Sequence, residues 1–291
     1  MSKESALIAA LRALAPHPAA RGLQDDCAVL DFGGETMILT HDMMVEGVHW
    51  LPGQDMADVA WKLVAANLSD LAAKGAEPIG VLLGFTLGED DTRFLHGLNE
   101  ALTAFAVPLL GGDTVSANGP RSLGLTALGR ATCRPVPDRR GASPGDTLWL
   151  TGPVGAAMLG FEALRDKTDA SSTAFRRPLP RLAEGRALAP IVTAMMDVSD
   201  GLLIDAARMA QASAITFAIN STNVPFPASL PPARQDEAMR WGDDYELLFT
   251  LPPGTNPPIP AHHIGTASLP SGSPIIVDGA VPHNNLGYMH D

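Results

Sequence analysis

The sequence predicts a two-domain protein of the α/β or α+β class. Segments with helical spacing and short apolar segments typical of strands alternate irregularly through both halves of the 291 residues, as they do when helices pack on sheets. The stretch from Arg134 to Asp146 separates the halves, because it contains three prolines and two glycines, which interrupt regular structure. We therefore expect one domain over residues 1–136 and a second over residues 137–291.

The first half contains the most regular helical pattern. Residues 57–74 lack glycine and proline, and Gly75 then supplies a stop signal. Val59 and Leu63 fall on one face of the helix that this spacing predicts. The beginning of the chain predicts a short amphipathic helix. A further helix and two strands are expected at residues 92–106, 79–87 and 122–132.

The second half opens with a strand, a turn and a helix. The strand is expected at Thr147–Thr151, the glycine-containing turn at Gly152–Gly155 and the helix at Ala156–Arg165. Residues 166–177 are polar and predict a mobile loop. Another helix and two short strands are expected at residues 201–211, 262–267 and 274–278.

Composition excludes several classes of function. The net charge of −12 carries no clustered basic face, so nucleic-acid binding is not expected. No window approaches the ~18 apolar residues of a membrane span, and Glu4 and Arg12 interrupt any leader-like segment. With only two cysteines, the chain fits a reducing compartment, and we expect a cytoplasmic protein. Such an acidic chain can hold polyphosphate only through clustered arginines or bound metals.

Several aspartates share a sequence context. Apolar, strand-like segments end at Asp42, Asp113, Asp197 and, less regularly, Asp26, and ligands bind at the rim of open sheets. Each aspartate alone is better explained by capping the next turn. Together with Asp70 and Asp200 they favour one shared site, where mutual repulsion requires cations. Oxygen ligands without cysteine or histidine favour Mg²⁺ over zinc.

Other polar positions allow two interpretations each. Asp70 shares a helix face with Asn67, but Lys74 at i+4 allows an exposed ion pair instead. Ser199 or Asp200 can cap the helix that follows, or the same helix start can offer free N–H groups to a phosphate. The glycine turn at residues 151–155 is a second, weak candidate of this kind. Arg139 and Arg140 can reach a phosphate, although most arginines in linkers are only solvated.

Known phosphate loops and catalytic motifs are missing from the sequence. It contains no Gly-x-x-x-x-Gly-Lys-Ser/Thr, no Gly-x-Gly-x-x-Gly, no kinase His-Arg-Asp with Asp-Phe-Gly, and no His-Glu-x-x-His. His41 and His49 flank Asp42 without the spacing of a zinc site. For His49, contact with a phosphate or a substrate ring is the better hypothesis.

Seven short strings, in one order, resemble the thiamine-monophosphate kinase family, whose wider superfamily includes aminoimidazole-ribonucleotide synthetase. The strings span about residues 22 to 250. They are Asp25-Asp26-Cys-Ala-Val-Leu, Thr40-His-Asp42 with Val45-Glu-Gly-Val-His49-Trp, Ala66-Asn-Leu-Ser-Asp70-Leu-Ala-Ala-Lys-Gly-Ala, Gly111-Gly-Asp113-Thr, Thr151-Gly-Pro-Val-Gly, Met196-Asp-Val-Ser-Asp200-Gly-Leu and Gly242-Asp-Asp-Tyr-Glu-Leu-Leu248.

The resemblance implies a two-domain, aminoimidazole-ribonucleotide synthetase-like fold. The amino-terminal α/β domain would bind ATP and metal and pair its sheet with that of a second copy in a homodimer, and the carboxy-terminal domain would be α+β. It also implies Mg²⁺-dependent transfer of the γ-phosphoryl group of ATP to thiamine phosphate, with several Mg²⁺ ions. No partner among nucleic acids or membranes is implied.

Carried over by position, the resemblance assigns roles to individual residues. The implied metal-site residues are Asp26, Thr40, His41, Asp42, Asp70, Asp113, Asp197 and Asp200. The implied ATP contacts are Gly112, Asp113, Arg139 and Ser199, and the implied thiamine-phosphate contacts are His49, Asp243 and Tyr288. Two positions depart from the family pattern: His41 stands where a hydroxyl residue is usual, and Asp243 where glutamate is usual.

The implied reaction needs no general base, because the acceptor phosphate is already ionised. Neutralising and aligning two anions is the main task, so direct in-line transfer assisted by metal is expected. Two alternatives remain at this point. One is another ATP-dependent synthetase of the same superfamily, and the other is a nucleotide-binding regulator without catalysis, for which His41 and Asp243 are the only hints.

Overall fold

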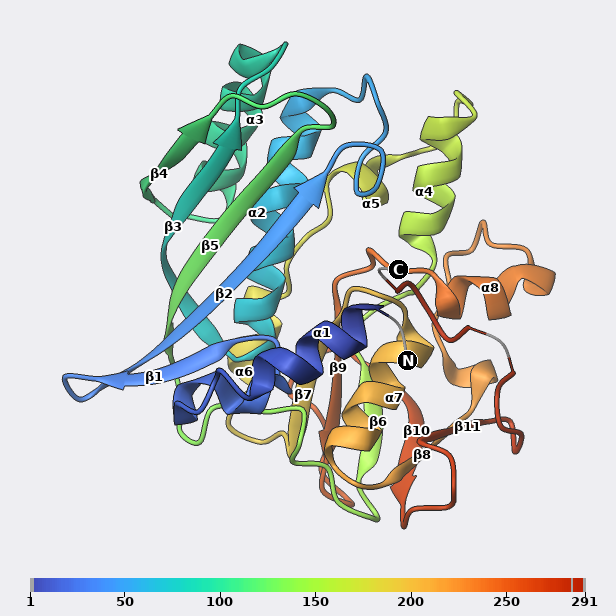
Figure 1. Cartoon of the computed structure of the whole chain (residues 1–291). Helices are drawn as coiled ribbons and strands as arrows, with labels where there is room; N and C mark the ends of the chain where they lie inside the picture. The colour runs from blue at the N-terminus through green and yellow to red at the C-terminus, as the bar shows by residue number, and fades with distance from the viewer. Residues whose placement is uncertain (1–2, 284, 290–291) are drawn as a thin grey trace.

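Two mixed β-sheets organise the chain in the computed structural model, which describes residues 3–283 and 285–289 (Figure 1). All strands of the first sheet precede the breaker-rich stretch, and all strands of the second follow it. Both sheets carry helices, and the predicted two-domain α/β or α+β class is confirmed. Within the described residues, none of the helices has the length and apolarity that crossing a bilayer requires.

The first sheet has five strands, antiparallel except for β3 and β4, which run parallel. In spatial order they are β1 (Ala28–Phe32), β2 (Glu35–Val45), β5 (Ser122–Ala131), β3 (Ala76–Thr86) and β4 (Leu109–Val115). Helices α2 (Met56–Ala73) and α3 (Asp91–Ala104) pack on one face. On the other face, the residues that the structure describes leave Met43, Leu82 and Leu110 exposed.

The second sheet has six strands with a core on each face. In spatial order they are β11 (Ile275–Val277), β8 (Thr216–Ile219), β10 (His262–Ser268), β6 (Thr147–Leu150), β9 (Glu246–Leu251) and β7 (Ala194–Val198). Helix α7 (Leu202–Ala212) packs on one face. Helix α6 (Leu182–Leu188) and the end of α2 contribute to the core on the other face.

The remaining helices lie around the two sheets. They are α1 (Lys3–Arg12), α4 (Ala156–Arg165), α5 (Thr173–Arg176) and α8 (Gln235–Arg240), with 3₁₀ turns at Pro18–Leu23, Ser221–Asn223 and Pro232–Arg234. Helices α4 and α8 lie on the same side of the second sheet as the carboxy-terminal segment in Figure 1.

Helix α2 connects the two halves because both cores include it. Its Leu63 and Leu68 belong to the first core, whereas Ala72 and Ala73 belong to the core beneath the second sheet. Neighbouring helices approach its backbone closely: a Cβ added at Gly97 would lie 2.1 Å from the carbonyl oxygen of Ala57. Small residues therefore set how closely the elements around this helix pack.

The structure confirms the predicted helices and strands to within a few residues at their ends, except that the strand-like segment ending at Asp26 is wrong: a 3₁₀ turn, Pro18–Leu23, and a loop precede that residue. The hypothesis of a mobile loop at residues 166–177 is wrong in part, because α5 forms there and Phe175 is buried. Several elements were not predicted, including β1, β8 and β9. The aspartates also differ from the expected positions at strand ends, since Asp42 and Asp113 lie inside β2 and β4.

Candidate active site

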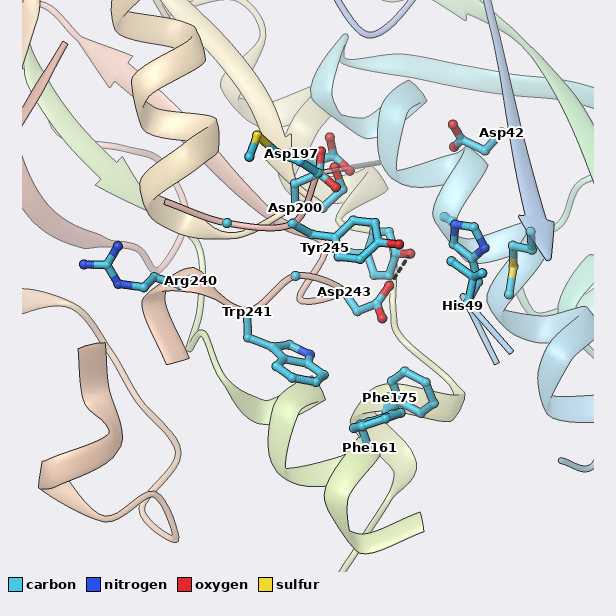
Figure 2. A pocket seen from close by; sticks show the side chains of 18 of the residues that line it. Asp42, His49, Phe161, Phe175, Asp197, Asp200, Arg240, Trp241, Asp243 and Tyr245 are labelled. Carbon is cyan, nitrogen blue, oxygen red and sulfur yellow. Dashed lines mark hydrogen bonds between the residues drawn. The ribbon is translucent and has the colours of Figure 1, made fainter. Parts of the chain in front are cut away.

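A cavity of about 570 Å³ opens where the first sheet, α2 and the second half of the chain meet. Figure 2 shows Asp42, Asp197 and Asp200 at one end and the rings of Phe161, Phe175 and Trp241 at the other. His49, Asp243 and Tyr245 lie between these ends. The cavity thus joins an acidic end to an aromatic end.

The acidic end is built from segments that are far apart in the sequence. Carboxylate oxygens of Asp26, Asp70 and Asp197 all lie within 4.8 Å of one another. They come from the segment before β1, from α2 and from β7 respectively. Asp42 of β2 lines the cavity beside them. Of the six aspartates predicted to share a site, these four therefore lie together.

Neutral groups hold the carboxylates of Asp70 and Asp197 and the backbone of Asp42 in place. Thr40 Oγ1 donates to Asp70, and Ser69 Oγ donates to Asp197 at 2.7 Å. The side-chain oxygen of Asn67 accepts the Asp42 N–H at 3.0 Å, which fixes β2 against α2. Asn67, Ser69 and Asp70 all belong to α2, so a single helix aligns the cluster.

Burial makes these carboxylates hard to ionise. Burial, followed by the charge of Asp200, raises the pKa of Asp42 from 3.8 to about 6. Burial likewise raises the pKa of Asp197 to about 7, and burial together with the charges of Asp42 and Asp197 raises the pKa of Asp70 well above its usual value. In the part of the chain that the structure describes, no lysine or arginine forms an ion pair with Asp42, Asp70 or Asp197, and their oxygen donors fit a hard divalent cation such as Mg²⁺.

A second group of charges lies directly behind the cluster. The Lys74 ammonium contacts Asp25 Oδ1 at 2.5 Å and Asp26 Oδ2 at 2.9 Å. The guanidinium of Arg139 bonds the other oxygen of Asp26, and Arg21 bonds Asp25. Although burial raises the pKa of Asp25, the charge of Lys74 and the hydrogen bonds from Lys74 and Arg21 hold it below its usual value. This part of the site is already neutralised.

This network excludes one of the two interpretations of Lys74 and shows which partners the two arginines have. Lys74 does not form an exposed pair with Asp70, because its side chain is fully buried and faces Asp25 and Asp26. Arg139, expected to contact ATP, is bonded to Asp26 and largely buried. Arg140 pairs with Asp138 at the surface, as the solvated alternative predicts. Arg139 belongs to the breaker-rich stretch between β5 and β6, which thus contributes a cation to the site.

The start of α7 differs from the capping hypothesis, and a side chain of the helix binds the two N–H groups just before it. Gly201 is the N-cap residue, and neither Ser199 nor Asp200 caps the helix through its side chain. Instead, the N–H groups of Ser199 and Asp200 both donate to Asp205 Oδ2 at 3.1 Å. Arg208 bonds Asp200 and Asp205 together. These N–H groups are therefore not free for a phosphate, although Ser199 and Asp200 do line the cavity.

The glycine turn at residues 151–155 is also occupied by the protein itself. The carboxylate of Asp244 accepts the Gly155 N–H at 2.9 Å and the Ala157 N–H at 3.4 Å. The Asp244 carboxylate therefore occupies the N-terminus of α4, where the helix dipole favours an anion. The hypothesis that this turn binds a phosphate is wrong.

The middle of the cavity is organised by a buried lysine. Lys62 Nζ bonds Asp243 Oδ2 at 2.9 Å and the His49 carbonyl at 3.0 Å, and it lies 3.8 Å from the centre of the Phe175 ring. The Tyr245 hydroxyl donates to the other oxygen of Asp243 at 3.0 Å (Figure 2). Both oxygens of Asp243 are thus held in fixed positions.

All three residues expected to contact thiamine phosphate line the cavity: His49, Asp243 and Tyr288. The Tyr288 N–H donates to the Asp200 carbonyl at 2.9 Å, which places the carboxy-terminal segment against the acidic end. Sequence reasoning missed Lys62 and Tyr245, together with the ring cluster of Phe161, Phe175 and Trp241. A lysine within an otherwise apolar helix was the one available signal.

The structure does not bring His41, Gly112 and Asp113 into the cluster. Because side chains alternate along a strand, His41 lies on the opposite face of β2 from Thr40 and Asp42, and its ring contacts Thr126 Oγ1 at 2.8 Å. Gly112 and Asp113 are exposed on β4, which is separated from β2 by β5 and β3. The side chains of His41 and Asp113 therefore lie apart from the aspartate cluster of the same subunit.

Comparison with known proteins agrees with this arrangement. The family "AIR synthase related protein, N-terminal domain" matches residues 24–131, and its C-terminal counterpart matches residues 143–256. A thiamine-monophosphate kinase of Salmonella typhimurium is 37% identical over 249 residues, which are 79% of this chain and 76% of that protein. The chain belongs to the thiamine-monophosphate kinase family.

Solved structures of that family superpose over nearly the whole chain. AaThiL complexed with AMPPCP and TMP has a TM-score of 0.86 at 26% identity and covers 97% of this chain and 96% of its own. Thiamine-monophosphate kinase from Stenotrophomonas maltophilia has a TM-score of 0.78 at 30% identity, with 94% and 95% covered. The fold that the resemblance implied, with its two related domains, is confirmed.

Proposed function

We propose that this protein is a thiamine-phosphate kinase, which transfers the γ-phosphoryl group of ATP to thiamine phosphate and releases thiamine diphosphate and ADP. The observation that carries the proposal is the cavity, which joins buried carboxylates in need of cations to a cluster of aromatic rings. Membership of the thiamine-monophosphate kinase family supports it.

The two ends of the cavity suit the two ends of thiamine phosphate. The rings of Phe161, Phe175 and Trp241 suit the flat, cationic ring system, since aromatic faces attract cations. Asp243, fixed by Lys62 and Tyr245, adds negative charge on that side. The phosphate of the substrate then extends toward the aspartates, where the γ-phosphate of ATP must also arrive.

Mg²⁺ is the cation that this chemistry and the donor set favour. Asp42, Asp70 and Asp197 would hold it, with Asp26 at the edge of the same cluster. When bound, the metal supplies the positive charge that lets two phosphates approach each other. The side chains contribute by positioning the reactants, because α2 aligns the carboxylates and Asp243 orients the acceptor. Direct in-line transfer without a phosphorylated enzyme follows, because an ionised phosphate needs no general base.

A homodimer is the second part of the proposal. The face of the first sheet opposite α2 and α3 carries Met43, Leu82 and Leu110, exposed by 55%, 40% and 52%. A sheet face of this kind is usually covered by another layer. Gly112 and Asp113 lie on this sheet, so we assign their roles to the subunit interface and not to the aspartate cluster of their own subunit. Light scattering tests this: a monomer at micromolar concentration contradicts it.

We further propose a cytoplasmic location, because both thiols are free, and a boundary between the domains at residues 136 and 137. The breaker-rich stretch and the gap between the two matched families support that boundary.

The kinase assay decides between the proposed function and its alternatives. Purified protein is incubated with ATP, Mg²⁺ and thiamine phosphate, and both ADP and thiamine diphosphate are measured. Matched amounts of both products are expected, and omission of Mg²⁺ should abolish them. ADP release only with a different acceptor would identify another synthetase of the superfamily, and ATP binding without ADP release would identify a regulator. An isolable aspartyl phosphate would rule out direct transfer.

A further inference from the structure

The ammonium group of Lys74 occupies a site that resembles a cation site. It lies 2.5 Å from Asp25 Oδ1, 2.9 Å from Asp26 Oδ2 and 3.4 Å from the Met195 carbonyl oxygen. Its side chain is fully buried, as is that of Asp25. Several oxygens around one buried positive charge are what a protein offers to a hard metal ion.

This site adjoins the carboxylates proposed to bind Mg²⁺. Asp26 contacts Lys74 and also lies within 4.8 Å of oxygens of Asp70 and Asp197. Within residues 3–283 and 285–289, no lysine or arginine forms an ion pair with Asp70 or Asp197. The acidic end is therefore divided: the Asp25–Asp26 side has its own cations, and the Asp70–Asp197 side has none.

We propose that Lys74 is a resident cation of the metal site, which takes the place of one divalent ion between Asp25 and Asp26. The inference rests on the metal-binding part of the proposed function. A tethered ammonium neutralises the two carboxylates at any metal concentration, because it cannot dissociate. It therefore keeps Asp26 close to Asp70 and Asp197 even without metal, and the site binds one divalent ion fewer than its carboxylates would otherwise require.

The experiment measures metal binding by Lys74→Met in the full chain without substrates. The replacement fills the same space with an apolar side chain and leaves Asp25 and Asp26 without their ammonium. Mn²⁺ is titrated by calorimetry and by electron paramagnetic resonance. We expect one additional bound Mn²⁺ per chain compared with the wild type, and a rise in Tm on adding Mg²⁺ that is several degrees larger.

Two variants serve as controls. Lys62→Met removes another fully buried lysine from α2, but one that contacts Asp243 and not the cluster; its number of Mn²⁺ ions should equal that of the wild type. Asp25→Asn combined with Lys74→Met removes one carboxylate together with the ammonium, and should return the number of ions to the wild-type value.

An unchanged number of Mn²⁺ ions in Lys74→Met, with the same stabilisation by Mg²⁺ as in the wild type, would overturn the proposal. A variant that stays unfolded at every Mg²⁺ concentration would also count against it, since a divalent ion should restore the missing charge. Because no substrate is present, either failure leaves the kinase assay as an independent test of the proposed function.

Discussion

Two groups of buried aspartates lie next to each other in this protein and are stabilised in opposite ways. Asp25 and Asp26 are enclosed by Lys74, Arg139 and Arg21, and the pKa of Asp25 is lowered. Asp70 and Asp197 are held by hydroxyl groups, and burial raises the pKa of each. The same residue type is thus paired with cations in one group and, in the other, is left in the state that the proposed metal site requires.

The largest expected effect is a loss of kcat when a carboxylate of the group without cations is replaced. Asp197→Asn and Asp42→Ala should each lower kcat by about 10³-fold, because charge stabilisation of the transferring phosphoryl group is the main catalytic contribution. Neither variant should lower the Tm of the metal-free protein, since each removes a buried, repelled carboxylate. Kinase assays and calorimetry check both outcomes. Turnover close to wild type at saturating Mg²⁺ would remove that residue from the metal site.

In the group that has cationic partners, a substitution should lower stability more than it lowers kcat. Asp25→Asn breaks a fully buried pair with Lys74, and such a loss costs about 3–5 kcal/mol of unfolding free energy. The Tm should fall by about 6–15 °C, while the kcat of the folded fraction drops far less than in Asp197→Asn. A chain as stable as the wild type would show that the two aspartate groups do not differ in the way described.

A smaller effect, on the KM for thiamine phosphate, is expected from a substitution in the middle of the cavity. Lys62→Met frees Asp243, so the KM for thiamine phosphate should rise about 10-fold, whereas kcat and the KM for ATP should change little. Steady-state kinetics with each substrate varied in turn measure this. The matched comparison is Tyr245→Phe, which removes the other bond to Asp243 and should act on the same constant. Equal losses for both substrates would mean that Lys62 supports the fold and does not position Asp243.

The smallest effect is a change of stability with pH. Asp42 and Asp197 have a pKa of about 6 and about 7 in the folded protein, against 3.8 for an ordinary aspartate. The folded state therefore keeps protons that the unfolded state has lost, and stability falls as pH rises from about 4 to 7. The metal-free Tm should decrease by a few degrees between pH 5.5 and 7.5.

Scanning calorimetry of the wild type and Asp197→Asn separates this contribution from that of other groups. The variant should show a weaker dependence on pH, and saturating Mg²⁺ should weaken the dependence in the wild type. Identical curves for wild type and variant would mean that Asp197 keeps an ordinary pKa.

The sequence predicted the order of elements and most residues of the site. The breaker-free segment 57–74 became α2 and the apolar segment 79–87 became β3, because spacing and stop signals are local properties. A shared site was predicted from the strand-like contexts of Asp26, Asp42, Asp113 and Asp197 together with Asp70 and Asp200; Asp26, Asp42, Asp70 and Asp197 do converge, whereas Asp113 lies apart on β4. Alternation along a strand already predicts that His41 lies on the opposite face from Thr40 and Asp42. Only the pairing of β2 with β5 fixed which of these faces is outward.

The sequence by itself determined the local structure, the acidic character of the site and the family. Only the tertiary structure decided which cation meets which carboxylate. Lys74 lies 49 residues from Asp25, and Lys62 lies 181 residues from Asp243, so neither pairing leaves a local pattern. The physical reason is burial, because a charge that is removed from water is stable only with a partner of opposite charge or with a bound metal ion.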